Sequence, residues 1–192
     1  MAYRTKYDYL SSIEELKAEL DKHKKNSSIF DEQVIDKPQI RLNFRRAENE
    51  LKNAEALFKI SENSNLKSEL GLLQNDTFYS GAISHSYYSI FFSTKALLLK
   101  EGVKTKSPNI HKATLDAFAY YLITNGKLDM ELLNIYKSAI IKADTLLGLF
   151  ISEKDKRGTF TYQELPDANI GPAEESINNA KKFLSHINKI IQ

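Results

Sequence analysis

The sequence has no cysteine among its 192 residues. A chain without cysteine forms neither a disulfide framework nor a thiolate metal site, and it suits a reducing compartment. The first ten residues, MAYRTKYDYL, also lack the apolar core of a signal peptide. We therefore expect a cytoplasmic protein.

Long apolar runs and an excess of one charge are missing as well. No apolar run approaches the roughly 20 residues that span a bilayer, so we expect no membrane partner. Lysine and arginine outnumber aspartate and glutamate by only 27 to 25. This balance is too even to predict nucleic-acid binding from long-range charge. Any anion-binding site must therefore be local.

Glycine and proline are scarce, with 7 and 4 residues, and they cluster between segments of helical periodicity. Strands therefore have little room. Apolar residues at helical spacing predict helices over residues 12–25, 41–60, 76–100, 107–125, 129–151 and 172–192. Gly81 is expected to let another helix approach closely, and Ser107 with Pro108 is expected to begin a helix as N-cap and first residue.

The predicted fold is all-α, an antiparallel up-and-down helical bundle over residues 38–192. Residues 1–37 are expected to form an N-terminal helical arm and a linker, since residues 26–38 are polar with few apolar anchors. The length favours one domain with a full-sized core.

Motifs of the common nucleotide enzymes and metal sites are absent. The sequence has no GxGxxG or GxxxxGK[ST] motif, and its four histidines show no HxxxH or HExxH spacing. We expect no cofactor and no metal, although a metal centre assembled from distant residues stays an alternative. Ser84-His85-Ser86 is a weak basis for a catalytic triad, and we interpret His85 as hydrogen-bonded to a neighbouring helix.

Two further groups have a structural and a functional interpretation. His111 follows Lys104 and Lys106 near a helix start, where N–H and ammonium groups can bind a phosphate, but a solvated helix end is the simpler interpretation. Tyr87 and Tyr88 have the ring chemistry to stack on bases, although aromatic residues at this spacing usually belong to a core.

The most informative stretch runs from Lys154 to Tyr162. It lies where regular structure is least expected, and loops on a rigid scaffold often carry function. Arg157 can hold a phosphate through two parallel hydrogen bonds, and the Tyr162 hydroxyl can position a neighbouring oxygen. The structural alternative is that Arg157 pairs with Asp155 or with a helix C-terminus.

A family resemblance rests on residues 81–99, GAISHSYYSIFFSTKALLL, followed by Gly102-Val103 and His111-Lys112. This pattern resembles the HEPN domain family (higher eukaryotes and prokaryotes nucleotide-binding), whose second main helix typically shows A-x-x-R-x-Y-Y-x-x-F-x-x-x-x-A-L-L. The resemblance covers residues 41–192. It implies a helical bundle that dimerises, with a polar cleft lined by both subunits.

The resemblance implies three possible roles: an RNA-cleaving toxin, a partner of a small nucleotidyltransferase, or an RNA-binding module. In the active ribonucleases of the family, an arginine is followed after four to six residues by a histidine. Here Arg157 matches the arginine and Tyr162 replaces the histidine. The related form R-x-x-x-D-Y fits with Thr161 in place of aspartate. Gly158 replaces a polar residue, and a serine at position 84 or 86 stands near a common arginine.

These departures favour binding over cleavage. A tyrosine with a pKa near 10 is a poor general base, whereas Arg157 can still stabilise phosphate charge. We predict a homodimeric HEPN-type module of a toxin-antitoxin or stress and defence system that binds RNA or a nucleotide through Arg157, Lys156 and Lys154. Two alternatives stay open: a non-catalytic nucleotidyltransferase partner in which Tyr162 is nucleotidylated, and a metal-independent endoribonuclease with Arg157 and Tyr162 as its catalytic residues.

Overall fold

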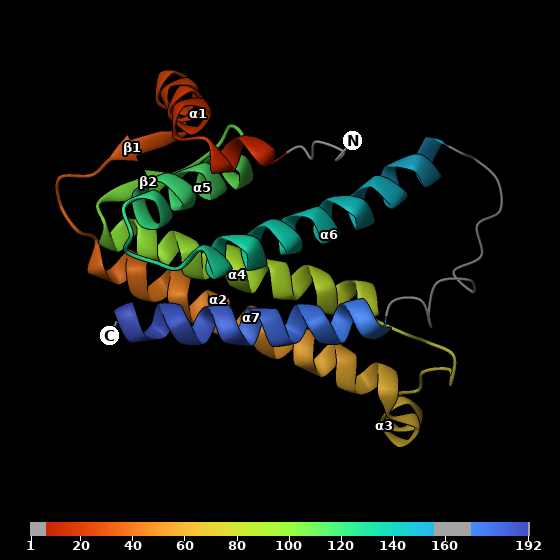
Figure 1. Ribbon diagram of the computed structural model, residues 1–192. Helices are drawn as coiled ribbons and strands as arrows, with labels where there is room; N and C mark the ends of the chain where they lie inside the picture. The colour runs from red at the N-terminus through yellow and green to blue at the C-terminus, as the bar shows by residue number, and fades with distance from the viewer. Residues whose placement is uncertain (1–6, 156–169, 192) are drawn as a thin grey trace.

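The computed structural model describes residues 7–191 except 156–169, and within residues 145–155 it describes the backbone alone. Four long helices form the body of the molecule: α2 (Lys37–Glu62), α4 (Tyr79–Lys100), α6 (Met130–Asp155) and α7 (Ile170–Ile191). Helix α4 packs against the other three, and α2, α4 and α7 lie side by side (Figure 1). The predicted all-α bundle is confirmed.

Most of the short elements complete the fold at one end of this bundle (Figure 1). They comprise a 3-10 turn η1 (Asp8–Ser11), helices α1 (Ile13–Lys25) and α5 (Ile110–Phe118), and a π-helical segment η2 (Ala119–Thr124). Helix α3 (Ser64–Glu69) lies at the opposite end (Figure 1). Strands β1 (Ile29–Asp31) and β2 (Val103–Thr105) form an antiparallel pair in which Ile29 faces Thr105. The expected linker therefore contributes a strand that ties the arm to the bundle.

Local hydrogen bonds accompany the shifted starts of two helices, α2 and α4. The Asp36 carboxylate accepts from the Gln39 N–H at 2.9 Å, so α2 begins at Lys37 rather than at residue 41. Asp76 does not open α4, because its carboxylate accepts from the Leu73 N–H at 2.8 Å. Helix α4 begins at Tyr79, and no side chain caps its first turn.

The prediction that Ser107 and Pro108 begin a helix is wrong. Helix α5 begins at Ile110, after Asn109 in the left-handed conformation with φ 58°. The residues just before it are bound to the arm, because the Lys106 N–H donates to the Ser28 carbonyl at 3.0 Å and the Ser28 hydroxyl donates to the Pro108 carbonyl. These bonds to the arm hold the segment outside the helix.

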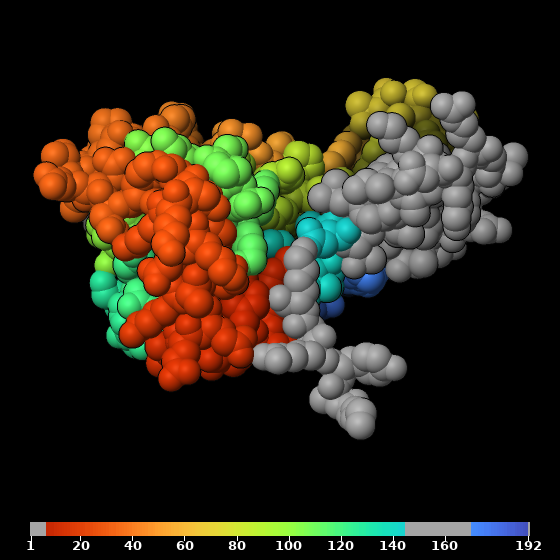
Figure 2. All heavy atoms as spheres, turned by 90° about the horizontal axis from the view of Figure 1, so that it is seen from above, coloured from red at the N-terminus to blue at the C-terminus, as the bar shows by residue number. Residues whose placement is uncertain are grey.

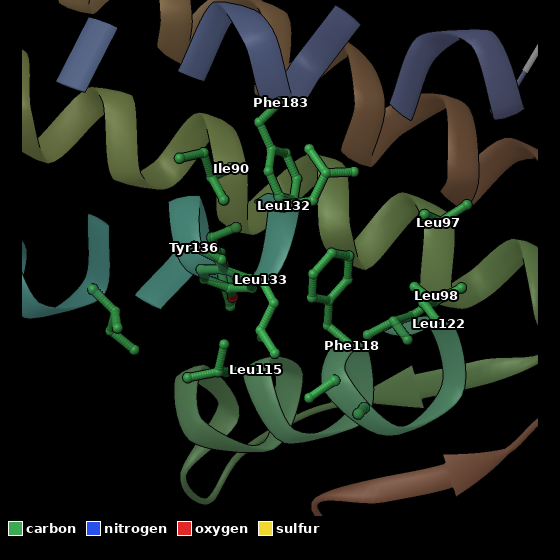
Figure 3. Close-up of a cluster of buried hydrophobic side chains, with 14 of the residues drawn as sticks. Ile90, Leu97, Leu98, Leu115, Phe118, Leu122, Leu132, Leu133, Tyr136 and Phe183 are labelled. Atoms are coloured by element: carbon green, nitrogen blue, oxygen red, sulfur yellow. The ribbon is translucent and has the colours of Figure 1, made fainter. Parts of the chain in front are cut away.

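The core is centred on three fully buried rings, Phe118, Tyr136 and Phe183, which come from α5, α6 and α7 (Figure 3). Their ring centroids lie 5.6–6.1 Å apart. Aromatic pairs at such separations add to the stabilisation from buried area. The same apolar cluster includes Leu16 and Leu20 of α1, so the arm shares the core of the bundle.

Helix α2 approaches α4 closely at Gly81, as the sequence predicts. A Cβ atom at this position would lie 2.9 Å from Leu57 Cδ1 on α2. Separately, none of the helices in the described ranges is long and apolar enough to cross a membrane.

Candidate functional site

The residues predicted to bind phosphate fall mostly beyond the ranges that the structure describes. Lys156, Arg157 and Tyr162 lie outside the described residues, and Lys154 belongs to the last turn of α6, where only the backbone is described. Their roles stay predictions. Within the described residues, a separate candidate for a binding site lies on α4 and at the start of α5.

His85 is a structural residue, as predicted. Its Nδ1 atom lies 2.6 Å from Glu50 Oε2, so the ring joins α4 to α2. Glu50 also pairs with Arg46, at 3.6 Å between Oε1 and Nε. The Ser84-His85-Ser86 sequence therefore supports helix packing, and the Glu50 carboxylate orients Arg46 as well.

One face of α4 carries an aromatic and cationic surface. We call Tyr88, Phe92, Lys95 and the neighbouring Arg46 the stacking platform. Tyr88 is 38% exposed, and its ring stacks on Phe92 with centroids 6.2 Å apart and an interplanar angle of 25°. The Arg46 guanidinium lies 4.0 Å from the centre of the Phe92 ring. In Figure 2, yellow-green atoms of α4 reach the surface beside the orange atoms of α2.

Lys95 brings a second cation to this platform. Its Nζ atom lies 5.7 Å from the centre of the Phe91 ring, and within the described residues it pairs with no carboxylate. Burial lowers the pKa of Lys95, and the nearby charges of Arg46 and Lys104 lower it further. Arg46 and Lys104 are paired with Glu50 and Glu32, so Lys95 is the cation of this group with charge left for an anionic ligand.

His111, at the start of α5, borders the platform. Its ring lies 4.5 Å from Phe91 and 6.2 Å from Tyr88, and its Nδ1 atom is 2.6 Å from the Tyr87 hydroxyl. Burial raises the pKa of Tyr87 well above its ordinary value, so the phenol keeps its proton. Burial also lowers the pKa of His111, with Lys95 acting in the same direction and Asp144 opposing it. The imidazole is therefore neutral near pH 7.

A pocket of about 370 Å³ is lined in part by His111. Its lining comes from the residue before η1, the residues before and at the start of α5, and the middle of α6, namely Tyr7, Ser107, Asn109, Ile110, His111, Lys112, Ile140 and Asp144. The Tyr7 hydroxyl donates to Asp144 Oδ2 at 3.0 Å across this junction. Figure 2 shows a hollow where the red N-terminal segment, the green residues before α5 and the cyan α6 meet.

A buried polar network lies between α1 and α5, centred on the fully buried Asp116. Its carboxylate accepts from the Tyr9 hydroxyl at 2.5 Å and from Lys112 Nζ at 2.9 Å, and it lies 2.9 Å from His23 Nε2. Burial and the Asp116 charge raise the pKa of Tyr9. Burial opposes protonation of Lys112, but its hydrogen bonds to Glu19 and Asp116 raise its pKa overall.

Glu19, His23 and Asp116 have ligand atoms within 4.8 Å of one another, which is the spacing of a metal site. However, Lys112 Nζ bonds both Glu19 Oε2 at 2.5 Å and Asp116 Oδ2 at 2.9 Å. A metal ion would have to displace this ammonium group. The arrangement fits a structural ion network that joins the arm to α5 better than a metal site.

This network makes stability depend on pH. Hydrogen bonds from Lys112 and Lys22 lower the pKa of Glu19 from 4.5 to about 2. A lowered folded-state pKa stabilises the protein above the unfolded value, and that contribution is lost as the pH falls from about 4.5 towards 2. We expect Glu19→Gln to lose less stability than the wild type across this range.

Urea unfolding midpoints measured at several pH values would check this prediction. Glu14→Gln, on the exposed surface of the same helix, is the matched control. Equal acid sensitivity of the wild type and Glu19→Gln would contradict it.

Sequence reasoning missed Tyr7, Arg46 and Asp144, because each acts through a tertiary contact. Tyr7 and Asp144 are 137 residues apart, and the sequence around neither one marks the pair. Arg46 carries a weak signal, since it lies on a predicted helix beside the apolar position Ala47. Lys95 and Tyr88 share a helix face at a spacing of seven residues, and that pattern was available.

Comparison with known proteins gives three relatives of modest similarity. Putative toxin MJ0142 of Methanocaldococcus jannaschii is 35% identical over 95 residues, which are 50% of this chain and 56% of that protein. Putative toxin MJ0605 of the same organism is 31% identical over 133 residues, 69% of this chain and 90% of the relative. A UPF0332 protein of Thermotoga maritima is 28% identical over 121 residues, 63% and 78% of the two chains. No family model and no solved structure matches.

Proposed function

Because the chain belongs to the family of Putative toxin MJ0605 from Methanocaldococcus jannaschii, we propose that it is a toxin-type protein that binds single-stranded RNA. The motif on α4 resembles the HEPN domain, and we propose a homodimer of that type working in a toxin-antitoxin system. The family membership and the all-helical bundle support this assignment.

The stacking platform is the observation that carries the proposal. Proteins that bind single strands combine an exposed aromatic ring, on which a base stacks, with cations that contact the backbone. Tyr88 offers the ring, which stacks on Phe92. Arg46 and Lys95 supply cations near these rings. The side chain of Arg46 is 61% exposed, so its guanidinium can reach a phosphate.

Arg157, Lys156 and Lys154 are proposed as further phosphate contacts, on the strength of the sequence alone. A bidentate arginine suits a phosphate better than a lysine does. Tyr162 stands where the ribonucleases of the HEPN family have histidine, so we propose binding rather than cleavage. The proton that burial keeps on the Tyr87 hydroxyl fits the same proposal.

The central prediction concerns Tyr88. Tyr88→Ala removes the exposed ring and is expected to weaken binding of a single-stranded RNA by about 1–3 kcal/mol, the usual worth of one stacked base. Tyr88→Phe keeps the ring and should bind nearly as well as the wild type. Fluorescence anisotropy with a labelled oligouridine of about ten nucleotides, at fixed salt, gives the affinities.

Three accompanying measurements sharpen the test. Arg157→Ala should weaken RNA binding. It should also reduce the slope of log affinity against log salt concentration by about one, the value for one lost phosphate contact. Light scattering on each variant shows whether Tyr88 acts through dimerisation instead. An intact oligonucleotide after incubation supports binding without cleavage. A wild-type protein that binds no RNA would contradict the proposal and favour the role of a nucleotidyltransferase partner.

A further inference from the structure

The first turns of α2 carry an excess of positive charge. Residues 37–47, KPQIRLNFRRA, contain four cations and no carboxylate, although the whole chain has a net charge of only +2. Lys37, Arg41 and Arg45 recur every four residues and are exposed, so they form one line on the outer face of the helix. We call these three residues the basic stripe. Successive members lie about 6 Å apart along the helix axis, and the stripe is about 12 Å long.

This arrangement works against the stability of the helix. Cations one turn apart repel each other, and a helix N-terminus favours acidic residues, of which the first turn of α2 has none. Within the described residues, the ion pairs of α2 involve Arg46, Glu50 and Glu55, so no ion pair compensates the stripe. A line of exposed, unpaired cations stabilises nothing in the fold, and it indicates an anionic ligand.

The basic stripe continues from the stacking platform. Phe92 of α4 contacts Arg46 of α2, and near the end of α4 Leu99 belongs to one apolar cluster with Ile40. The two helices therefore run antiparallel, and beyond the platform α4 lies beside the first turns of α2 (Figure 1). Arg46 directly follows Arg45 in the sequence, so the stripe ends where the platform begins.

We propose that the basic stripe is a track for the phosphates of a single-stranded RNA whose bases stack on the platform. The inference rests on the proposed function and deepens it, because it gives the ligand a minimum length. The strand extends from Tyr88 past Arg46 and along about 12 Å of α2, which a mononucleotide does not do. Guanidinium groups suit this task, since each presents a fork of N–H donors to phosphate oxygens.

An acidic protein segment is the competing partner for the stripe. Val34, Ile35 and Leu42 are exposed apolar residues close to it in the sequence, and an acidic segment with apolar side chains would contact them. The position of the stripe favours the nucleotide strand, because it adjoins the exposed Tyr88 ring and the exposed Arg46 guanidinium. A cationic track beside an aromatic ring is the combination that binds single strands.

Salt dependence tests the stripe. In the triple variant Lys37→Gln, Arg41→Gln, Arg45→Gln, the affinity for a labelled decauridine is measured by anisotropy at several salt concentrations. Each phosphate contact to a single strand adds about 0.7 to the slope of log affinity against log salt, so three lost contacts lower it by about 2. Between about 50 and 200 mM salt, the wild-type affinity is therefore expected to fall about 20-fold more than that of the variant.

The matched control removes three exposed lysines elsewhere, on α1 and at the far end of α2. Lys17→Gln, Lys25→Gln, Lys59→Gln changes the net charge equally and should keep the wild-type slope. The stripe variant should also unfold at a urea concentration no lower than the wild type, since it relieves repulsion between cations one turn apart. Equal loss of slope in both triple variants would assign the effect to overall charge and overturn the inference.

Comparison with Tyr88→Ala separates the stripe from the platform. If Tyr88→Ala weakens binding but the stripe variant keeps the wild-type slope, the inference is overturned and the platform stands. A reduced slope in the stripe variant with no effect of Tyr88→Ala supports the stripe and contradicts the platform. If the wild type binds no RNA, both proposals fail.

Competition with a decaglutamate peptide tests the other class of partner. Unlabelled decauridine is expected to displace the labelled strand at a much lower concentration than the peptide does, because only the nucleotide strand also uses the Tyr88 ring. Equal displacement by the two competitors would assign the stripe to acidic polypeptides and overturn the inference.

Discussion

Replacing Phe118 with alanine is expected to lower the free energy of unfolding by about 3–5 kcal/mol. The Phe118 side chain is fully buried, and its ring contacts Tyr136 of α6 and Phe183 of α7 at centroid distances of 5.8 and 5.6 Å. Removing it leaves a cavity where three helices meet, which close-packed neighbours can fill only in part. The pairwise ring contacts are lost as well.

Urea denaturation followed by circular dichroism measures this loss. Leu73→Ala is the control, because Leu73 is 68% exposed and a surface change of this kind stays within about 0.5 kcal/mol. A Phe118→Ala protein that is as stable as Leu73→Ala would show that the three rings do not form the centre of the core.

Asp116→Ala is expected to cost about 3 kcal/mol, the second-largest effect. The change leaves His23, Lys112 and the Tyr9 hydroxyl without the carboxylate that they share. Breaking a buried ion pair on one side is costly, because the remaining polar groups stay out of water with no partner. The arm should loosen first, since two of these three groups belong to it.

The matched comparison is Glu19→Gln in the same network. Glu19 keeps a quarter of its side chain exposed, and a glutamine there can still accept a hydrogen bond from Lys112, so Glu19→Gln is expected to cost less than Asp116→Ala at neutral pH. Hydrogen exchange on α1 would separate local from global loosening. If Asp116→Ala and Glu19→Gln had the same free energy of unfolding, the burial of Asp116 would not explain how the network stabilises the fold.

The helices could be predicted because their apolar residues repeat along the local sequence. Phe44, Ala47, Leu51, Ala54 and Phe58 step by 3, 4, 3 and 4 residues, and α2 contains all of them. The strand pair was missed for the opposite reason. Each strand has three residues, too few for an alternating pattern, and the pairing of Ile29 with Thr105 is a long-range contact.

The candidate site was less predictable than the fold. Asp116 looks like one polar residue on an amphipathic helix, and only the folded chain brings His23 to it from 93 residues away. From the sequence alone Tyr88 has two interpretations, a ring that stacks on bases and a core residue, and only the folded chain shows that it is exposed. Arg157 and Tyr162 rest on the family motif and stay predictions.

The long reach of the arm has a consequence for the order of folding. Tyr7 and His23 are synthesised long before their partners Asp144 and Asp116, which follow 137 and 93 residues later. During translation these two side chains therefore lack their native partners until α6 and α5 have emerged from the ribosome. Closing such distant contacts is slow compared with forming local helices. This part of the arm is made before its partners but is among the last parts of the chain to reach its native place.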